Sequence, residues 1–368
     1  MTSIVPGGRV ARWRRRASSG YLACGLAVVS LFVGASAVAA CTVPVKEHIG
    51  VARSVRPSDL IQASDSKTAC VSGEPGPTLS EAELATGLTF NCIVTYTDVE
   101  PTWADWVDPW ITNRSISPFV AWMAADPKGR QLVDTEDLIP ASESTNRNWT
   151  GECAAGEFDT YAEQFATNMV AAGFGYSVIR LGHEMNGTWE IDDLGSTVAK
   201  WHLWAQCFAR EVTAMRAVRG AHFLFDWNVN GRYRVIPLAD YYPGNAFVDI
   251  IGISQYDESG WPLPPVGTAA RWKALVSEPM GLNEVYAFAA QHHKPLSIPE
   301  WGTVVKIGDD GEYVANIGDF VASHDVAYQA WFNVPDDGIF MLNATEAPHS
   351  VAAYVKTISR MANSEAAG

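Results

Sequence analysis

The chain has 368 residues, 48% of them apolar, and a formal net charge of −15 at pH 7. This length and apolar content are enough for one large domain with a full hydrophobic core. The acidic excess argues against binding to nucleic acid or to an anionic membrane surface, and it suits a neutral ligand.

The N-terminus has the layout of an export signal. A basic run at residues 9–16 precedes an apolar stretch that ends in small residues, as in secretory signal peptides. Two cleavage sites are possible. Ala-Val-Ala suits an ordinary signal peptidase, and Val-Ala-Ala-Cys, ending at Cys41, resembles a bacterial lipobox. We predict a signal peptide over residues 1–40, with the lipoprotein type favoured and Cys41 lipidated. The product is then a cell-surface lipoprotein or a secreted protein.

The cysteine count favours the lipobox. Removal of residues 1–40 leaves five cysteines, and lipidation of Cys41 leaves four, enough for two disulfides in an oxidising compartment. Counting alone permits three pairings. We predict that sequence neighbours pair, which gives Cys70 with Cys92 and Cys153 with Cys207. The leader holds five arginines and no acid, so the remainder has 21 basic and 41 acidic residues and a net charge near −20.

Short apolar runs alternate with helical patterns along residues 42–368, which we expect to form one catalytic domain. Near-continuous apolar strands that alternate with helices indicate a parallel sheet covered on both faces. Eight such units predict a (β/α)8 TIM barrel. The long polar segment at residues 125–157 is predicted to be a loop at the wall of a cleft. The predicted strands are EHIGVAR near residue 50, FNCIVTYTD from Phe90, SPFVAWM from Ser117, YSVIRLG from Tyr176, HFLFDWN from His222, VDIIGIS from Val248, KPLSIPEW from Lys294 and VAYQAWFN from Val326.

Catalytic groups of such barrels lie at the C-terminal ends of the strands. From the third strand to the eighth, the predicted ends carry Trp122; His183, Glu184 and Asn186; Trp227 and Asn228; Gln255, Tyr256 and Asp257; Glu300 and Trp301; Trp331 and Asn333. Aromatic faces and hydrogen-bonding groups at one rim suit a neutral polyhydroxylated ligand. Two glutamates across such a cleft, Glu184 and Glu300, are the apparatus of glycoside hydrolysis.

Other chemistries find little support in the sequence. His183-Glu184 could open a zinc-protease motif, but that motif needs a histidine at position 187, where Gly187 stands. With no other cluster of histidines or cysteines, we predict no metal and no cofactor. A serine-hydrolase elbow and a glycine-rich nucleotide loop are both missing from the sequence.

Two motifs resemble glycoside hydrolase family 26, a family of retaining (β/α)8 enzymes. They are HEMNG with the preceding Arg180, and PEWG at residues 299–302. FDWNVNG and ISQYD lie between them in the family's order, so the resemblance runs through most of residues 42–368. It implies that Glu184 is the acid/base and Glu300 the nucleophile.

The resemblance also implies that Tyr256 hydrogen-bonds the nucleophile and that His183 lies in the substrate site. It further implies endo-acting hydrolysis of a β-linked polysaccharide, with β-1,4-mannan as the default. β-1,3-Xylan, mixed-linkage glucan and a cell-envelope polysaccharide stay open, because the segment after HEMNGTW departs from the family pattern. For retention, the two carboxyl groups should lie about 5–5.5 Å apart.

Each assignment has a structural alternative. Glu184 could merely pair with Arg180, Glu300 could belong to a structural turn, and Tyr256 and His183 could be core residues. The rival function is a surface carbohydrate-binding lipoprotein without turnover. We expect a monomer whose partner is a poly- or oligosaccharide. The predicted substrate-binding residues are Asn186, Trp189, Trp227, Asn228 and Trp331.

Overall fold

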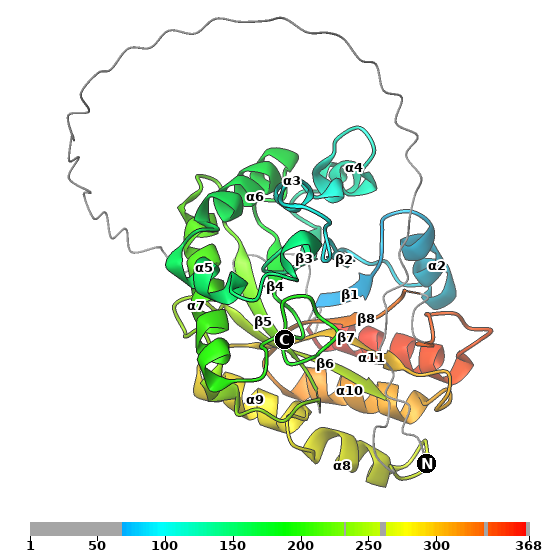
Figure 1. Ribbon diagram of the computed structural model, residues 1–368. Coiled ribbons are helices and arrows are strands. Elements are labelled where there is room, and N and C mark those ends of the chain that lie inside the picture. Colours follow the sequence, from blue (N-terminus) through cyan, green and yellow to red (C-terminus); the bar gives the residue numbers. More distant parts are fainter. Residues whose placement is uncertain (1–67, 232, 258–262, 335–337, 366–368) are drawn as a thin grey trace, which may run out of the picture. The chain divides into compact units, whose positions relative to one another are not determined.

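The computed structural model describes residues 68–365 except 232, 258–262 and 335–337. Eight strands form a closed barrel in chain order, and helices surround it (Figure 1). Each strand pairs in parallel with the next, and β8 closes on β1. The predicted (β/α)8 barrel is therefore confirmed. The strands are β1 (Thr68–Ser72), β2 (Cys92–Tyr96), β3 (Gln131–Glu136), β4 (Val178–Leu181), β5 (Leu224–Asn230), β6 (Ile250–Asp257), β7 (Leu296–Thr303) and β8 (Val326–Trp331).

Helices connect the strands and pack on the outside of the barrel. Helix α7 follows β4, and α10 follows β7. Among the described residues, no helix combines the length and the apolar character needed to cross a membrane. The helices are α2 (Pro77–Thr86), α3 (Trp103–Val107), α4 (Pro118–Ala125), α5 (Trp149–Ala155), α6 (Asp159–Ala172), α7 (Val198–Ala217), α8 (Ala269–Ser277), α9 (Leu282–Gln291), α10 (Gly311–Ser323) and α11 (Pro348–Glu365).

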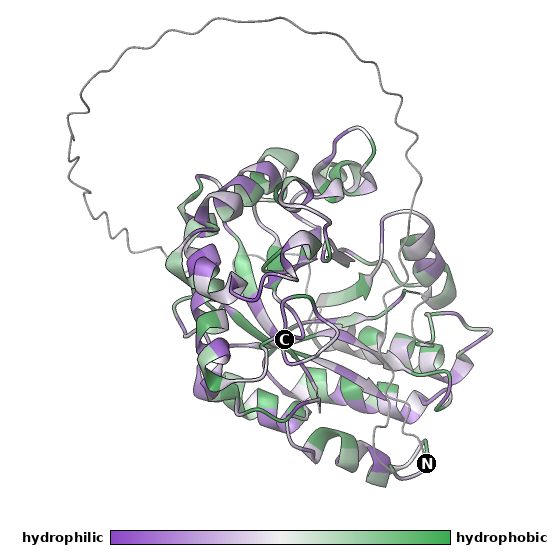
Figure 2. Ribbon diagram, in the orientation of Figure 1, coloured by the Kyte–Doolittle hydropathy of each residue, from purple (hydrophilic) through white to green (hydrophobic). Residues whose placement is uncertain are grey.

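The core has two layers that follow from the alternation of side chains along each strand. On β5, Leu224 belongs to the apolar cluster inside the barrel, whereas Phe225 and Trp227 belong to the cluster between the strands and the helices. Figure 2 shows apolar residues along the strands and mixed faces on the helices. Inward positions thus alternate with outward ones, and only the inward ones can reach a site at the barrel mouth.

Two of the eight predicted strands are not the ones that build the barrel. The predicted strand near residue 50 lies outside the described residues, and the first barrel strand is β1. The run SPFVAWM is helix α4, because Ser117 caps it by accepting the Phe119 amide and Pro118 occupies its first turn. Trp122 therefore lies on a helix, and not at a strand end.

The third strand is β3, inside the segment predicted as a loop. It is buried along its whole length although it carries Gln131, Asp134 and Glu136. Helix α5 forms in the same segment. The prediction of a loop at 125–157 was wrong because buried carboxyl groups make β3 look like an exposed polar segment.

Both predicted disulfides are present. Cys70 and Cys92 are direct partners in the β1–β2 register, inside the barrel. The Cys153–Cys207 bond joins α5 to α7. Each bond links two neighbouring elements that the fold already brings together.

Candidate active site

Glu300 points into the barrel because β7 is irregular. Ser297 bonds the inward-facing Asp226, so strict alternation would turn Glu300 outward, three residues later. The register of β7 shifts between Ile298 and Trp301, and such a bulge re-aims the side chains that follow. Both carboxylate oxygens of Glu300 are then held.

Arg180 and Tyr256 hold these two oxygens. Arg180 Nη2 lies 2.8 Å from Glu300 Oε1, and the Tyr256 hydroxyl donates to Oε2 at 2.7 Å. Arg180 is fully buried on β4 and also donates to Thr135 Oγ1 at 2.9 Å and Asn228 Oδ1 at 2.6 Å. The ion-pair partner of Arg180 is thus Glu300, and the alternative in which it pairs with Glu184 is wrong.

Glu184 stands on a strained turn after β4. Its φ is 48°. Gly182, two residues earlier, has a φ of 57° and no room for a Cβ, which would lie 2.6 Å from the Trp204 ring. The Glu184 amide donates to the Asn228 carbonyl at 2.8 Å. Left-handed backbone at a residue other than glycine costs of order 1–3 kcal/mol and is enriched at functional sites. The Trp189 indole donates to Glu184 Oε2 at 3.0 Å.

The environments of the two glutamates shift their pKa values in opposite directions. Burial, together with the negative charge of Glu300, raises the pKa of Glu184 to about 7. Burial also acts to raise the pKa of Glu300, but the Arg180 guanidinium and the Tyr256 hydrogen bond outweigh it, so that this pKa falls below its ordinary value. Near neutral pH, one carboxyl therefore holds a proton and the other is ionised.

Two aromatic groups contact these carboxyls or pack against residues that hold them. The half-buried Phe332 packs edge-on against Tyr96 and Tyr256, with both centroid distances 5.9 Å. Trp189 packs against Tyr233 at 4.5 Å. We did not predict Phe332, yet alternation could have found it: Tyr328 and Ala330 face the barrel interior, so the next position in that series is 332.

Several predicted substrate-binding residues lie elsewhere. Trp227 is fully buried against Tyr241 and Tyr242 on the helix side of β5. Trp331 is also buried outside the barrel, and its indole donates to the Phe340 carbonyl. Both tryptophans fall on outward-facing positions, one residue away from the inward series. Trp189 alone among the predicted tryptophans contacts a candidate catalytic group.

The predicted amides have structural partners. The side-chain nitrogen of Asn186 donates to the Asn230 and Tyr233 carbonyls, and its oxygen accepts the Asn230 amide. Asn228 is fully buried, accepts from Arg180 and donates to the Val229 carbonyl. These hydrogen bonds tie the ends of β4 and β5 together.

The remaining predicted strand-end residues are also committed to the core. The Trp301 indole donates to Gln329, Asp257 accepts from Arg271, and Asn333 accepts the Leu342 amide. Gln255 is buried beneath the rim.

His183 lies among carboxyl groups. Its Nδ1 is 3.9 Å from Asp137 Oδ1, and its Nε2 is 3.7 Å from Glu190 Oε1. Burial, followed by the positive charge of Arg180, lowers the pKa of His183 to about 3, so the ring is neutral. Asp98, His183 and Glu190 are close enough to hold a metal ion.

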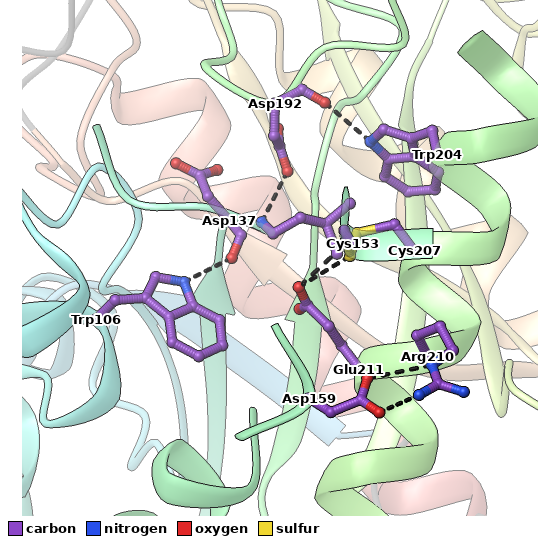
Figure 3. The surroundings of a disulfide bond; sticks show 10 residues. Trp106, Asp137, Cys153, Asp159, Asp192, Trp204, Cys207, Arg210 and Glu211 are labelled. Carbon is purple, nitrogen blue, oxygen red and sulfur yellow. Dashed lines mark hydrogen bonds and ion pairs between the residues drawn. A yellow bond between two sulfur atoms is a disulfide. The ribbon is translucent and has the colours of Figure 1, made fainter. Parts of the chain in front are cut away.

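A second close group contains Cys153, Cys207 and Glu211 (Figure 3). The two sulfurs form a disulfide and so offer no thiolate. Glu211 Oε1 lies 3.5 Å from the Cys153 sulfur, and burial raises the pKa of this carboxyl well above its ordinary range. The protonated carboxyl is therefore the donor in this contact.

An eight-stranded α/β barrel that carries two buried glutamates, with the pKa of one raised and that of the other lowered, is typical of the barrel glycosidases. Residues 153–265 match the family model of glycosyl hydrolase family 26. The resemblance deduced from the motifs is thus confirmed over this segment, and the chain is a glycosidase. A comparison with curated protein sequences gives no match.

Several solved structures share the fold. An endo-β-1,4-mannanase from Cellulomonas fimi has a TM-score of 0.58 at 18% identity, over 83% of this chain and 75% of that one. The Bacillus subtilis mannanase BCman has a TM-score of 0.54 at 14% identity, over 80% and 85%. The protein GH26C from Muricauda sp. has a TM-score of 0.56 at 14% identity, over 82% and 88%.

Proposed function

We propose that the protein is a retaining glycosidase in which Glu300 is the nucleophile and Glu184 is the general acid/base. The observation that carries this proposal is the difference in partners: Arg180 and Tyr256 hold both carboxylate oxygens of Glu300, whereas the neutral Trp189 indole donates to Glu184. This difference lowers the pKa of Glu300, and burial raises that of Glu184 to about 7. A double displacement needs one protonated and one ionised carboxyl at the start.

In the first step, the Glu300 carboxylate attacks the anomeric carbon while Glu184 gives its proton to the departing glycosidic oxygen. An ester between Glu300 and the sugar forms, and the glycosidic bond breaks. Because this ester is neutral, the charge that raised the pKa of Glu184 is gone.

In the second step, Glu184 accepts a proton from water, and the water oxygen attacks the anomeric carbon. The ester bond breaks and Glu300 leaves as a carboxylate, to which Arg180 and Tyr256 donate hydrogen bonds. The second inversion restores the original anomeric configuration.

We propose a β-linked polysaccharide as substrate, with β-1,4-mannan first. Two of the structures that share the fold are named as mannanases. The half-buried rings of Trp189, which donates to Glu184, and of Phe332, which packs against Tyr256, offer faces on which a sugar ring can stack. β-1,3-Xylan, mixed-linkage glucan and envelope polysaccharides are the other members of the test panel.

We also propose that the protein acts outside the cytoplasm as a monomer, secreted or anchored through Cys41. Two disulfides support the location, because disulfides persist in oxidising compartments. Blocking the lipidation site with Cys41→Ser should release the protein from the membrane fraction into the medium.

Product release from the glycan panel tests the activity. Purified residues 42–368 are incubated with each glycan, and the anomer formed first is followed by proton NMR. We expect cleavage of one glycan with the β-anomer appearing first. Initial release of the α-anomer would contradict the double displacement, and binding of a glycan without cleavage would favour the rival carbohydrate-binding function.

A further inference from the structure

Three polar side chains meet inside the barrel, further from its mouth than Glu300. Asp226 on β5 accepts two hydrogen bonds at the same oxygen, Oδ2. One comes from the Ser297 hydroxyl on β7 at 2.6 Å, and the other from the Tyr328 hydroxyl on β8 at 2.5 Å. All three side chains are buried. None of them takes part in the two chemical steps proposed above.

The hydrogen bonds of Asp226 are those of an ionised carboxylate. Burial raises its pKa to about 6, so the group is charged near neutral pH and both hydroxyls donate to it. Hydrogen bonds to an ionised acceptor are roughly twice as strong as those between neutral groups. Gly252, the register partner of Ser297 on β6, leaves room for the contact. A Cβ at this glycine would lie 2.6 Å from both Asp226 Oδ1 and Ser297 Oγ.

The irregularity that turns Glu300 inward begins directly after Ser297. Ser297 pairs with Gly252 and Glu300 pairs with Ser254, so three steps along β7 match two along β6. The extra residue lies between these pairs, where Pro299 has no N–H to donate to a neighbouring strand. The bulge is therefore flanked by two inward-facing side chains, Ser297 before it and Glu300 after it.

We propose that Asp226 and Ser297 are positioning residues for the nucleophile: their hydrogen bond fixes β7 before the bulge, so that Glu300 meets its partners after it. A slip of one residue turns the side chains of a strand to the opposite face. Arg180 and Tyr256 hold the strand on one side of the bulge, and Asp226 holds it on the other. The inference rests on the proposed role of Glu300 and identifies what places it.

The position of Glu300 can be measured without catalysis. Its pKa lies below the ordinary value because the contacts with Arg180 and Tyr256 outweigh the effect of burial. If Glu300 moves away from these two groups, its pKa should rise. A misplacement of about 1 Å in an active site can also cost about 10²-fold in rate.

An NMR titration of the purified protein tests the proposal independently of hydrolysis. Glutamates are isotope-labelled at the side-chain carboxyl carbon, and Glu300→Gln identifies the signal of Glu300. Ser297→Ala should raise the pKa of Glu300 by about one unit or more, because the contacts of this carboxylate loosen. With the glycan that the parent cleaves, kcat should fall about 10-fold or more with little change in KM.

Tyr328→Phe is the matched control, since it removes the other hydroxyl from the same oxygen of Asp226 but lies on β8. It should leave the pKa of Glu300 within about 0.3 units of the parent value. Asp226→Asn keeps an oxygen that accepts from Ser297, so it should not raise this pKa either. Asp226→Val removes the acceptor and should raise it as Ser297→Ala does.

Melting temperatures check that each variant folds, and either Ser297→Ala or Asp226→Val is enough to decide the outcome. An unchanged pKa of Glu300 in these two variants would overturn the proposal, as would an equal rise in Tyr328→Phe. If the parent cleaves no glycan but the pKa rises as expected, the positioning holds and the proposed hydrolysis fails. The two failures are thus distinguishable.

Discussion

Buried carboxyl groups on β7 and on β3 have pKa values shifted in opposite directions. On β7, contacts with Arg180 and Tyr256 bring the pKa of Glu300 below its ordinary value despite its burial. On β3, burial raises the pKa of Asp134 and Glu136 well above the ordinary range, and neither has a cationic partner. Burial is common to both sides, so the partner decides the direction of the shift.

This comparison explains how two glutamates in one cleft can take different roles. Glu184 resembles the β3 carboxyls: it is buried and near a negative charge, and the side chains that hydrogen-bond it, Trp189 among them, are neutral. Glu300 differs because the fully buried Arg180 faces it. The roles of the two glutamates and of their partners can therefore be tested by substituting one residue at a time.

The largest effect is expected from Glu300→Ala. Without the nucleophile, no glycosyl ester can form, and kcat should fall on the order of 10⁴-fold or more. Sodium azide should fit the vacated space and restore turnover with an activated aryl glycoside, giving an azide product of inverted configuration. Retained activity without azide would refute the assignment, and the melting temperature controls for the unpaired Arg180.

Glu184→Ala should cost about 10²–10⁴-fold in kcat on the natural glycan, because proton donation to the leaving group is lost. With a dinitrophenyl leaving group, which needs no proton, the first step should be nearly unaffected and a burst of product should precede slow turnover. An equal loss on both substrates would show that Glu184 is not the acid.

The parent pH profile follows from the same two groups. Activity should fall as pH rises through about 7, where Glu184 loses its proton, and also at acidic pH, where Glu300 gains one. Tyr256→Phe removes one stabilising hydrogen bond from the ionised Glu300. We expect the acidic limb to move up by about one pH unit and kcat to fall about 10-fold. An unchanged acidic limb would show that Tyr256 does not affect the pKa of Glu300.

The smallest effect concerns Glu211, a buried carboxyl without a cation. Its pKa is raised in the folded state, so folding retains a proton that the unfolded chain releases above about pH 4.3. The free energy of unfolding should therefore fall as pH rises from there. Glu211→Gln removes this loss and should stabilise the protein by about 1 kcal/mol at pH 8, roughly 2 °C in melting temperature, with little gain at pH 4. A gain independent of pH would contradict this reasoning.

Sequence patterns predicted most of the barrel because continuous apolar strands and amphipathic helices differ in period. They failed at β3 and α4 for opposite reasons. The carboxyls of β3 are buried with Thr97 as a hydrogen-bonding neighbour, which no local pattern reveals. Helix α4 is a short apolar run, which periodicity alone cannot distinguish from a strand.

Local sequence patterns were also insufficient to place the residues of the site. The motifs located Glu184 and Glu300, whereas Trp227 and Trp331 were misplaced by one residue in the alternation, and Phe332 was missed. A one-residue shift moves a strand side chain from the cleft to the helix side. Knowing which residue begins the inward series requires the barrel itself.

The sequence by itself predicted the barrel class from its alternating strands and helices, the two glutamates from their motifs, and the disulfides by pairing sequence neighbours. Only the tertiary structure decided that Arg180 faces Glu300, that a bulge turns Glu300 inward, and that Asp98 meets His183 and Glu190. Charge interactions act through space over a few ångströms, and residues on different strands and loops, such as Arg180 and Glu300, come that close only when the barrel closes.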